Sequence, residues 1–210
     1  MKGLEDVLLI RPDLHEDDRG YFYEVFNEKE FNEKTGGKYD FHVLQENESK
    51  SSKYVFRGLH FQKPPYEQAK LVRVLKGSVV DFAVDIRKDS PTFGRYTCAL
   101  LTGEGKEGFF IPRGFAHGFL VVSDEAVFEY KCDNYYNKES ESGIKWDDEN
   151  ILTLIPDPFN IDVSPSLKDN IAILCWQTSP GVKKPESGDW TDLLVLSEKD
   201  KNRITTLKDL

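Results

Sequence analysis

The stretch that decides the fold is Gly108-Phe109-Phe110-Ile111-Pro112-Arg113-Gly114-Phe115-Ala116-His117-Gly118-Phe119. Its first four residues are glycine and large apolar side chains of the kind that strands favour. Pro112 and Gly114 then give a turn signal, because proline fixes φ and glycine tolerates backbone conformations that other residues avoid. The stretch therefore predicts a short strand over Gly108–Ile111 and a tight turn after it, a pattern typical of all-β proteins.

Similar patterns dominate from about residue 42 to 135. The predicted strands are Phe41–Gln45, Ala69–Leu75, Val79–Ile86, Tyr96–Leu101, Gly108–Ile111 and Ala126–Tyr130. Turn signals at residues 76–78, 89–91 and 102–105 separate several of them. Helical signals are few, and one short helix is expected just after Asn27, with Asn27 as its N-cap. The chain is thus predicted to be a single all-β domain over residues 1–210, a sandwich or a barrel, with an irregular, proline-containing insert at about residues 153–189.

Composition excludes several classes of protein. The 210 residues carry a net charge of −9 without a basic run, which argues against nucleic acid as a partner. We expect neither a signal peptide nor a membrane span, since no long apolar run occurs. Cys98, Cys132 and Cys175 are odd in number and widely spaced, which fits a reduced, cytoplasmic protein rather than a disulfide framework or a cysteine-based zinc site.

Two segments resemble the two sequence motifs of cupins. Residues 108–117 have the G-x3-P-x-G-x2-H shape of the second motif, and residues 57–77 resemble the first. Metal-binding cupins carry His-x-His there and a carboxylate a few residues later, whereas this chain has His60-Phe61-Gln62 and places Lys70 near the carboxylate position. An ammonium cannot ligate a metal unless it is deprotonated. The resemblance implies a cupin-type double-stranded β-helix (a jelly-roll barrel), and the altered motif predicts no metal.

Most of the chain, from about residue 7 to 152 and again near the C-terminus, resembles the dTDP-4-dehydrorhamnose 3,5-epimerases. The motifs that carry this resemblance include residues 18–22, 45–47, 57–62, 70–72, 84–87, 90–94, 111–119, 130–131, 135–136, 143–146 and 196–200. It implies an isomerase that inverts C3 and C5 of a dTDP-4-keto-6-deoxyhexose, converting dTDP-4-dehydro-6-deoxyglucose to dTDP-4-dehydrorhamnose. The C4 ketone acidifies the hydrogens on both neighbouring carbons, so proton transfer alone suffices and we expect no cofactor.

The resemblance also implies catalytic roles. His60 matches the general base, and an imidazole suits that task because its ordinary pKa is near ~6.5. Asp200 matches the carboxylate that orients it, as in catalytic triads. Tyr130 matches the acid on the opposite face, and Lys70 matches the cation beside the C4 oxygen, where it would favour an enolate.

The same resemblance implies a set of substrate-binding residues and a homodimer. The set comprises Arg19, Phe22, Gln45, Asn47, Arg57, His117, Tyr136 and Lys201. Guanidinium groups suit the diphosphate, and aromatic rings offer packing surfaces for the nucleobase. In the family some of these residues cross a dimer interface, so we expect a homodimer with shared residues that binds a dTDP-sugar.

Each of these residues also has an ordinary structural explanation. His60 could be a buried histidine with a satisfied hydrogen bond, His117 a structural residue after the turn, and Tyr130 a packing residue at a strand end. Asp200 has a rival in Asp169, because Ser166-Leu167-Lys168-Asp169 resembles Ser197-Glu198-Lys199-Asp200. We prefer Asp200, since the residues around it reproduce the family's ending better.

Other functions stay open from the sequence. A 3- or 5-specific epimerase, or a ketoisomerase on a related dTDP-sugar, could use the same acid and base. A cupin that only binds a nucleotide sugar and a metal-dependent cupin enzyme are the alternatives from other classes.

Overall fold

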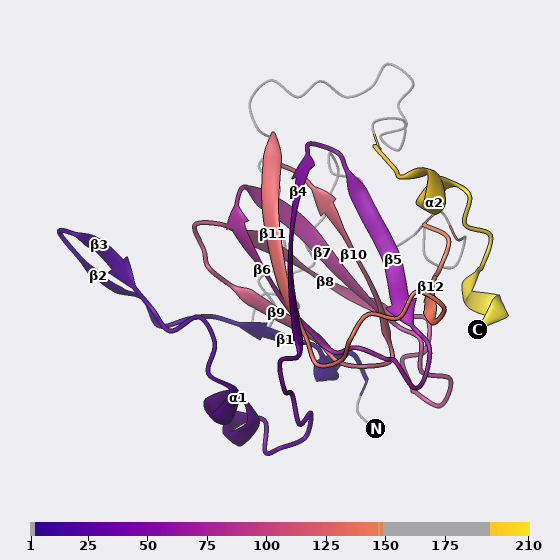
Figure 1. Ribbon diagram of the computed structural model, residues 1–210, viewed down its shortest axis with the longest axis horizontal. Helices are drawn as coiled ribbons and strands as arrows, with labels where there is room; N and C mark the ends of the chain where they lie inside the picture. Colours follow the sequence, from indigo (N-terminus) through magenta and orange to yellow (C-terminus); the bar gives the residue numbers. More distant parts are fainter. Residues whose placement is uncertain (1–2, 147, 149–193) are drawn as a thin grey trace.

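The computed structural model describes residues 3–146, 148 and 194–210 (Figure 1). Two five-stranded antiparallel sheets face each other. The first sheet has, in order, β1 (Leu8–Ile10), β9 (Gly108–Ile111), β6 (Lys70–Lys76), β11 (Glu125–Cys132) and β4 (Gln45–Ser52). The second has β12 (Glu141–Gly143), β5 (Phe56–Gln62), β10 (Phe115–Val121), β7 (Ser78–Asp85) and β8 (Tyr96–Thr102). This arrangement confirms the predicted all-β, cupin-type jelly roll with few helices.

The main core fills the space between the two sheets. The first sheet contributes alternate residues such as Val72, Phe109 and Phe128, and the second sheet faces them with Val79 and Phe119. Residues two apart in a strand share a face, so this alternation follows directly from the sequence. Burial of these side chains supplies the main free energy that holds the sheets together.

Two smaller clusters cover the outer faces. On the second sheet, Phe56, Val80 and Phe82 pack with Leu207 from the C-terminal segment. On the first sheet, Phe31 and Phe41 pack against Phe110, as part of a third cluster. The N-terminal and C-terminal segments are therefore fixed to opposite faces of the sandwich.

The few helices are short. Helix α1 (Glu28–Lys34) begins after Asn27, whose side chain accepts a hydrogen bond from the Glu30 amide at 3.1 Å, so the predicted helix and its N-cap are confirmed. Helix α2 (Glu198–Lys201) follows Ser197, and 3₁₀ turns occur at Leu4–Asp6 and Leu207–Asp209. None of the described helices is long and apolar enough to cross a membrane.

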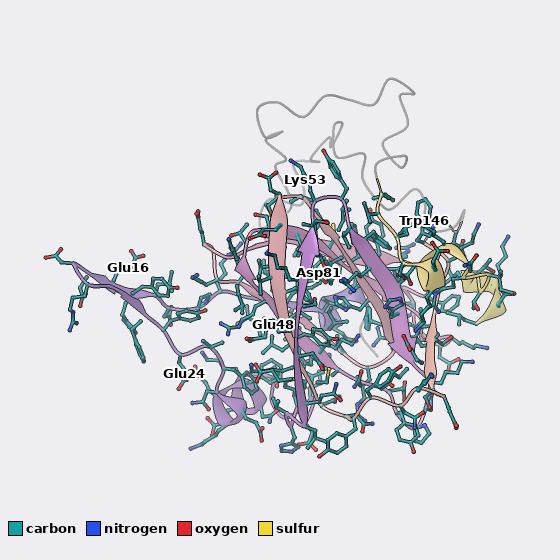
Figure 2. The ribbon with its side chains drawn as sticks, turned by 45° about the horizontal axis from the view of Figure 1, so that its top comes forward. Glu16, Glu24, Glu48, Lys53, Asp81 and Trp146 are labelled. Atoms are coloured by element: carbon teal, nitrogen blue, oxygen red, sulfur yellow. The ribbon has the colours of Figure 1, made fainter. Side chains whose placement is uncertain are left out.

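A hairpin of β2 (His15–Asp17) and β3 (Gly20–Phe22) extends from the body of the molecule. Figure 1 shows it on the side of the molecule away from α2, and Glu16 marks it in Figure 2. We call this hairpin the N-terminal arm. Its Phe22 is 71% exposed and its Tyr21 is 56% exposed, so in a single chain the arm leaves aromatic surface in water.

Most predicted strands match observed ones to within a few residues, but one prediction is wrong. The strand expected at Phe41–Gln45 begins at Gln45 and continues to Ser52, while Phe41 is buried in a loop. Strands β5 and β10, which carry the two motif histidines, were not among the predicted strands. The predicted insert at residues 153–189 and the rival Asp169 lie outside the described residues.

Candidate active site

The structure brings His60 and Asp200 together, although 140 positions separate them in the chain. His60 lies on β5 and Asp200 on α2, and His60 Nε2 is 2.6 Å from Asp200 Oδ1. Ser197 holds the carboxylate from the other side, because its hydroxyl donates to Asp200 Oδ2 at 2.8 Å and accepts from the Asp200 amide at 3.1 Å. The N-cap of α2 thus fixes the orientation of Asp200.

The environment of Asp200 favours its charged form. The side chain is only 3% exposed, and burial alone would raise its pKa, but the hydrogen bonds from His60 and Ser197 and the nearby Arg203 outweigh burial and lower the pKa. With Asp200 ionised, His60 Nε2–H donates to it and Nδ1 keeps a free lone pair. His60 itself is 29% exposed, so a ligand can reach its ring.

Lys70 and Tyr130 lie on the inner side of the facing sheet, on the paired strands β6 and β11. Lys70 Nζ is 5.7 Å from the centroid of the Tyr130 ring. Burial lowers the pKa of Lys70, and burial raises the pKa of Tyr130 although the charge of Arg57 opposes it. Tyr130 is therefore a phenol at neutral pH, which is the form that can donate a proton.

His117 and Asp81 form a buried pair next to His60. His117 on β10 lies opposite His60 in the register of β5, and its Nε2 is 2.9 and 3.0 Å from the two oxygens of Asp81 on β7. Burial raises the pKa of Asp81 and lowers that of His117. Figure 2 shows Asp81 inside the body of the molecule. The geometry makes His117 part of the floor of the site, and its contact with substrate stays a prediction.

Polar side chains of β4 line the first sheet beside Tyr130. Asn47 lies opposite Tyr130 in the β4–β11 register, and its Oδ1 accepts a hydrogen bond from Gln45 at 2.9 Å. Gln45 in turn accepts from the Tyr136 amide at 2.9 Å. The Nδ2 of Asn47 is buried without a hydrogen-bond partner among the described residues. This amide group therefore has an unsatisfied N–H donor beside Tyr130, the predicted acid.

Arg57 links the two sheets at this end. It lies on β5, and its Nε donates to the hydroxyl of Ser51 on β4 at 3.0 Å. Arg57 is exposed, and this is the one side-chain hydrogen bond of its guanidinium among the described residues. This geometry suits an anionic ligand entering between β4 and β5.

The sequence interpretation missed Glu141 and Lys199. Glu141 on β12 accepts a hydrogen bond from Tyr136 Oη at 2.7 Å and forms an ion pair with Lys199. Burial alone would raise the pKa of Glu141, but Lys199 and Tyr136 outweigh it and lower the pKa. Lys199 stands in the Ser197–Asp200 motif itself, which was the available signal, whereas the predicted Lys201 bonds to Glu198 at 2.9 Å on the exposed side of α2.

Arg19 and Phe22 do not join this group within one chain. Both lie on the N-terminal arm, where Arg19 pairs with Asp17. The arm points away from β5 and α2 in Figures 1 and 2. Within one chain, the structure therefore does not bring these two predicted substrate-binding residues to the others.

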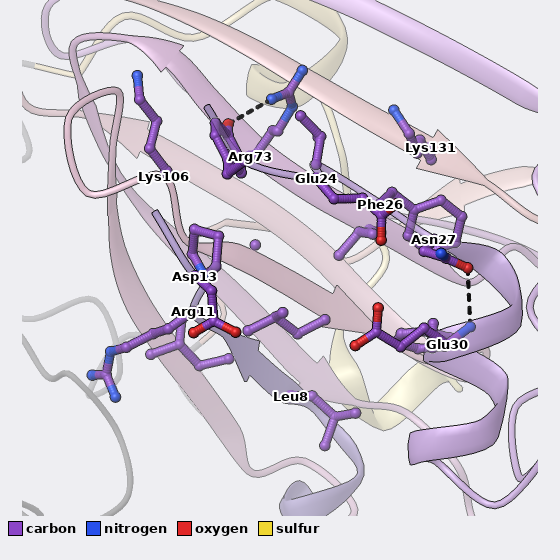
Figure 3. Close-up of a pocket in the computed structure, with 18 of the residues that line it drawn as sticks. Leu8, Arg11, Asp13, Glu24, Phe26, Asn27, Glu30, Arg73, Lys106 and Lys131 are labelled. Atoms are coloured by element: carbon purple, nitrogen blue, oxygen red, sulfur yellow. Dashed lines mark hydrogen bonds between the residues drawn. The ribbon is translucent and has the colours of Figure 1, made fainter. Parts of the chain in front are cut away.

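A cavity of about 590 Å³ occupies a different place, between the N-terminal segment and the outer face of the first sheet. Figure 3 shows Leu8, Arg11, Phe26 and Arg73 among its lining residues. None of the four predicted catalytic residues lines it. In the described part of the chain, no group of three or more His, Cys, Asp or Glu side chains is placed to hold a metal ion.

Comparisons with known proteins agree on one family. The profile described as dTDP-4-dehydrorhamnose 3,5-epimerase matches residues 2–177. A protein of that name from Escherichia coli (strain K12) is 49% identical over 162 residues, which is 77% of this chain and 86% of that protein.

Solved structures give the same result. The crystal structure of dTDP-4-dehydrorhamnose 3,5-epimerase from Elizabethkingia anophelis NUHP1 has 44% identity and a TM-score of 0.74, and the match covers 100% of this chain and 95% of that one. The dTDP-6-deoxy-D-glucose-3,5-epimerase of Legionella pneumophila Philadelphia 1, in complex with dTDP-4-keto-L-rhamnose, has 38% identity and a TM-score of 0.73, with 97% and 88% covered.

Proposed function

Because the chain belongs to the dTDP-4-dehydrorhamnose 3,5-epimerase family, we propose that it converts dTDP-4-dehydro-6-deoxyglucose to dTDP-4-dehydrorhamnose by inverting C3 and C5. The enzyme is an isomerase. The observation that carries the mechanism is the hydrogen bond between His60 on β5 of the second sheet and Asp200 on α2, with Tyr130 and Lys70 on the sheet that faces β5. A base and an acid on opposite sides of a sugar ring are what inversion next to a ketone needs.

In the first step His60 takes a proton from the carbon beside the ketone. Its Nδ1 forms the new N–H bond, the C–H bond breaks, and the electron pair moves to the C4 oxygen as an enolate. Asp200 stabilises the imidazolium through the bond to Nε2–H. Lys70 stabilises the enolate, because a developing negative charge beside its amine favours the ammonium form.

In the second step Tyr130 delivers a proton to the same carbon from the opposite face. The enolate electrons reform the ketone, and the phenolate that remains is neutralised as the imidazolium releases its proton through solvent. Burial keeps the pKa of Tyr130 high, so the phenol carries its proton until the enolate forms. The same pair of residues then serves the second carbon, with no oxidant or reductant involved.

We further propose a homodimer in which the N-terminal arm of one chain completes the site of the other. An isolated two-stranded hairpin is only marginally stable in water, and the exposed rings of Tyr21 and Phe22 gain stability by packing against a second copy. Arg19 would then meet the diphosphate and Phe22 the nucleobase. Within the partner's own body, Arg57, Gln45 and Tyr136 supply the remaining contacts.

A cytoplasmic location fits the cysteines. Among the described residues, Cys98 and Cys132 are free and buried. Burial raises the pKa of Cys98 to about 12 and that of Cys132 to about 11, so both stay protonated thiols. Free thiols of this kind are typical of a reducing compartment.

The direct test is to follow the C3 and C5 proton signals of dTDP-4-dehydro-6-deoxyglucose by NMR in D₂O. We expect exchange at both carbons, loss of both in His60→Ala, and product with both centres inverted. Exchange at one carbon only would identify a 3- or 5-specific epimerase. A protein that binds the nucleotide sugar yet exchanges neither proton would contradict the proposal.

A further inference from the structure

Arg203 lies next to Asp200 of the His60–Asp200 pair, and its side chain is largely buried. Its side chain is 10% exposed, and its Nε and Nη2 atoms are buried without a hydrogen-bond partner among the described residues. Burying a guanidinium with unsatisfied donors costs stability. A cation kept there at such a cost calls for a functional explanation.

The position of Arg203 ties it to both members of the pair. Its Nη2 lies 3.9 Å from Asp200 Oδ1, the same oxygen that accepts the hydrogen bond from His60. That distance is too long for a hydrogen bond but well within the range of a direct charge interaction. Arg203 therefore acts on Asp200 through its charge and does not displace His60 from the carboxylate.

Gly143 makes room for this guanidinium. A Cβ atom at Gly143 would lie 2.6 Å from Arg203 Nη1 and 2.7 Å from Arg203 Cζ, closer than real contacts allow. Gly143 on β12 lies opposite His60 in the register of β5. The guanidinium therefore packs on the strand residue that neighbours the base.

We propose that Arg203 is a positioning residue that tunes the basicity of His60 by keeping Asp200 as a carboxylate and partly offsetting its charge. This inference rests on the proposed function of the His60–Asp200 pair. Without the guanidinium, Asp200 would stabilise the imidazolium more strongly, and His60 would stay protonated up to a higher pH. Arg203 thus favours the neutral imidazole, the form that acts as the base.

Other charged and titratable groups surround His60 and also influence how readily it binds a proton. In the described part of the chain they are Asp200 and Lys199 on α2, Glu141 on β12, His117 and Asp81 on β10 and β7, Lys70 and Tyr130 on the first sheet, and Arg57 on β5. A variant at Arg203 changes only this residue and leaves all of these groups in place, so it can be compared directly with the wild type. A shift in the behaviour of His60 can then be assigned to the lost charge.

The test combines a pH profile with a titration that needs no substrate. In Arg203→Met, the acid limb of the kcat/KM profile for epimerisation should move up by about 0.5 to 1 pH unit, while the high-pH plateau is kept. The His60 ring signals in NMR of the ligand-free protein should titrate at a correspondingly higher pH. The chain has only four histidines, so a His60→Asn spectrum assigns the signals.

Three variants control the interpretation. Arg203→Lys keeps the charge and should keep the wild-type acid limb, and Arg95→Met removes an exposed arginine outside the site and should change nothing. If Arg203→Met does not fold, Arg203→Gln replaces it. An unchanged acid limb and titration in a folded neutral variant, or an equal shift in Arg203→Lys, would overturn the proposal. Failure of the wild-type enzyme to act on the sugar would instead reject the proposed function, and the titration would still decide the role of Arg203.

Discussion

The chemistry at His60 depends on which of its ring nitrogens is free. Asp200 accepts from Nε2 at 2.6 Å, so Nδ1 is the ring nitrogen left free to take a proton. A carboxylate in that position contributes twice, since it selects the tautomer and stabilises the imidazolium that forms. Removing its charge while keeping its shape should therefore impair proton abstraction more than binding.

Asp200→Asn is accordingly expected to lower kcat by about 10²-fold or more with little change in KM. Steady-state epimerisation of dTDP-4-dehydro-6-deoxyglucose measures both constants. Asp169→Asn is the matched control, because Asp169 stands in the similar Ser166–Asp169 sequence. If Asp169→Asn were the variant that lost activity, the assignment of Asp200 as the partner of His60 would be wrong.

In the proposed mechanism Tyr130 delivers a proton to the opposite face of the sugar. Its removal should therefore separate proton exchange from inversion, which the intact enzyme couples. In Tyr130→Phe, His60 can still take a proton and return a deuteron to the same face, which gives exchange without inversion. We expect inversion to fall by about 10²-fold while exchange at C3 or C5 persists. NMR in D₂O reports exchange and product stereochemistry in one sample.

Tyr136→Phe is the control for that experiment. It also removes a phenol hydroxyl at the site, one that donates to Glu141 at 2.7 Å. Its assigned role is in binding, so KM should rise while exchange and inversion stay coupled. Equal loss of exchange and inversion in Tyr130→Phe would argue against Tyr130 as a separate acid.

At the level of elements, the sequence predicted the strands with a clear apolar pattern, among them β6 and β11 with Lys70 and Tyr130, and missed β5 and β10, which carry His60 and His117. Strands β6, β7, β8 and β11 were found because one face enters the core between the sheets. Strand β5 was missed because Arg57, Gly58 and His60 interrupt its pattern. Residues kept for function can interrupt the local pattern that identifies a strand, as they do in β5.

Strand β4 shows the same effect more strongly. Its sequence is Gln-Glu-Asn-Glu-Ser-Lys-Ser-Ser, without an apolar residue, yet it forms eight residues of regular ladder with β11. It is an edge strand whose inner face lines a polar site and whose outer face meets water, so neither side requires an apolar residue. The prediction took the neighbouring Phe41 for a strand residue, although that ring is buried under α1 by Phe31 and Phe110.

An ion network at the end of β7 fixes the N-terminal segment to the sandwich, and it allows a prediction about stability. Arg87 donates to both oxygens of the fully buried Asp85, at 2.8 and 2.7 Å, and to Asp6 at 2.8 Å. Burial alone would raise the pKa of Asp85, but the bonds from Arg87, Ser90 and Thr92 outweigh it and lower the pKa. Arg87→Met leaves two buried carboxylates without this partner and should lower the free energy of unfolding by about 3 kcal/mol.

The pH dependence of that loss follows from the lowered pKa. A carboxyl whose pKa is lower in the folded state contributes stability above its ordinary value near 3.8, and this contribution disappears as the pH falls through the folded-state pKa. The difference between wild type and Arg87→Met should therefore be largest near pH 7 and shrink below about pH 4. Urea denaturation at several pH values measures it, and a difference that did not depend on pH would point to lost packing instead.

On the scale of the whole molecule, the predicted site residues lie in parts that one chain keeps far apart. His60 lies on the second sheet and bonds to Asp200, and Tyr130 and Lys70 lie on the facing sheet, whereas Arg19 and Phe22 lie on the N-terminal arm on the other side of the body. The sequence could place all six in family register, but register along a chain does not tell which copy of the chain supplies each residue. Only the extended position of the arm and its exposed rings favour the shared arrangement.

A complementation experiment tests this arrangement. One chain carries His60→Ala, and the other carries Arg19→Ala and Phe22→Ala, so each homodimer has two defective sites. In a mixed dimer with shared arms, one site combines both defects, while the other combines an intact body with an intact arm. When equal amounts of the two variants are dissociated, mixed and reassociated, about half of the dimers contain one chain of each kind. One of the two sites in each mixed dimer is intact, so about a quarter of all sites, and of the wild-type activity, should return. If each arm instead served its own body, every site in the mixed dimer would keep one defect, and activity would stay at the level of the two parents.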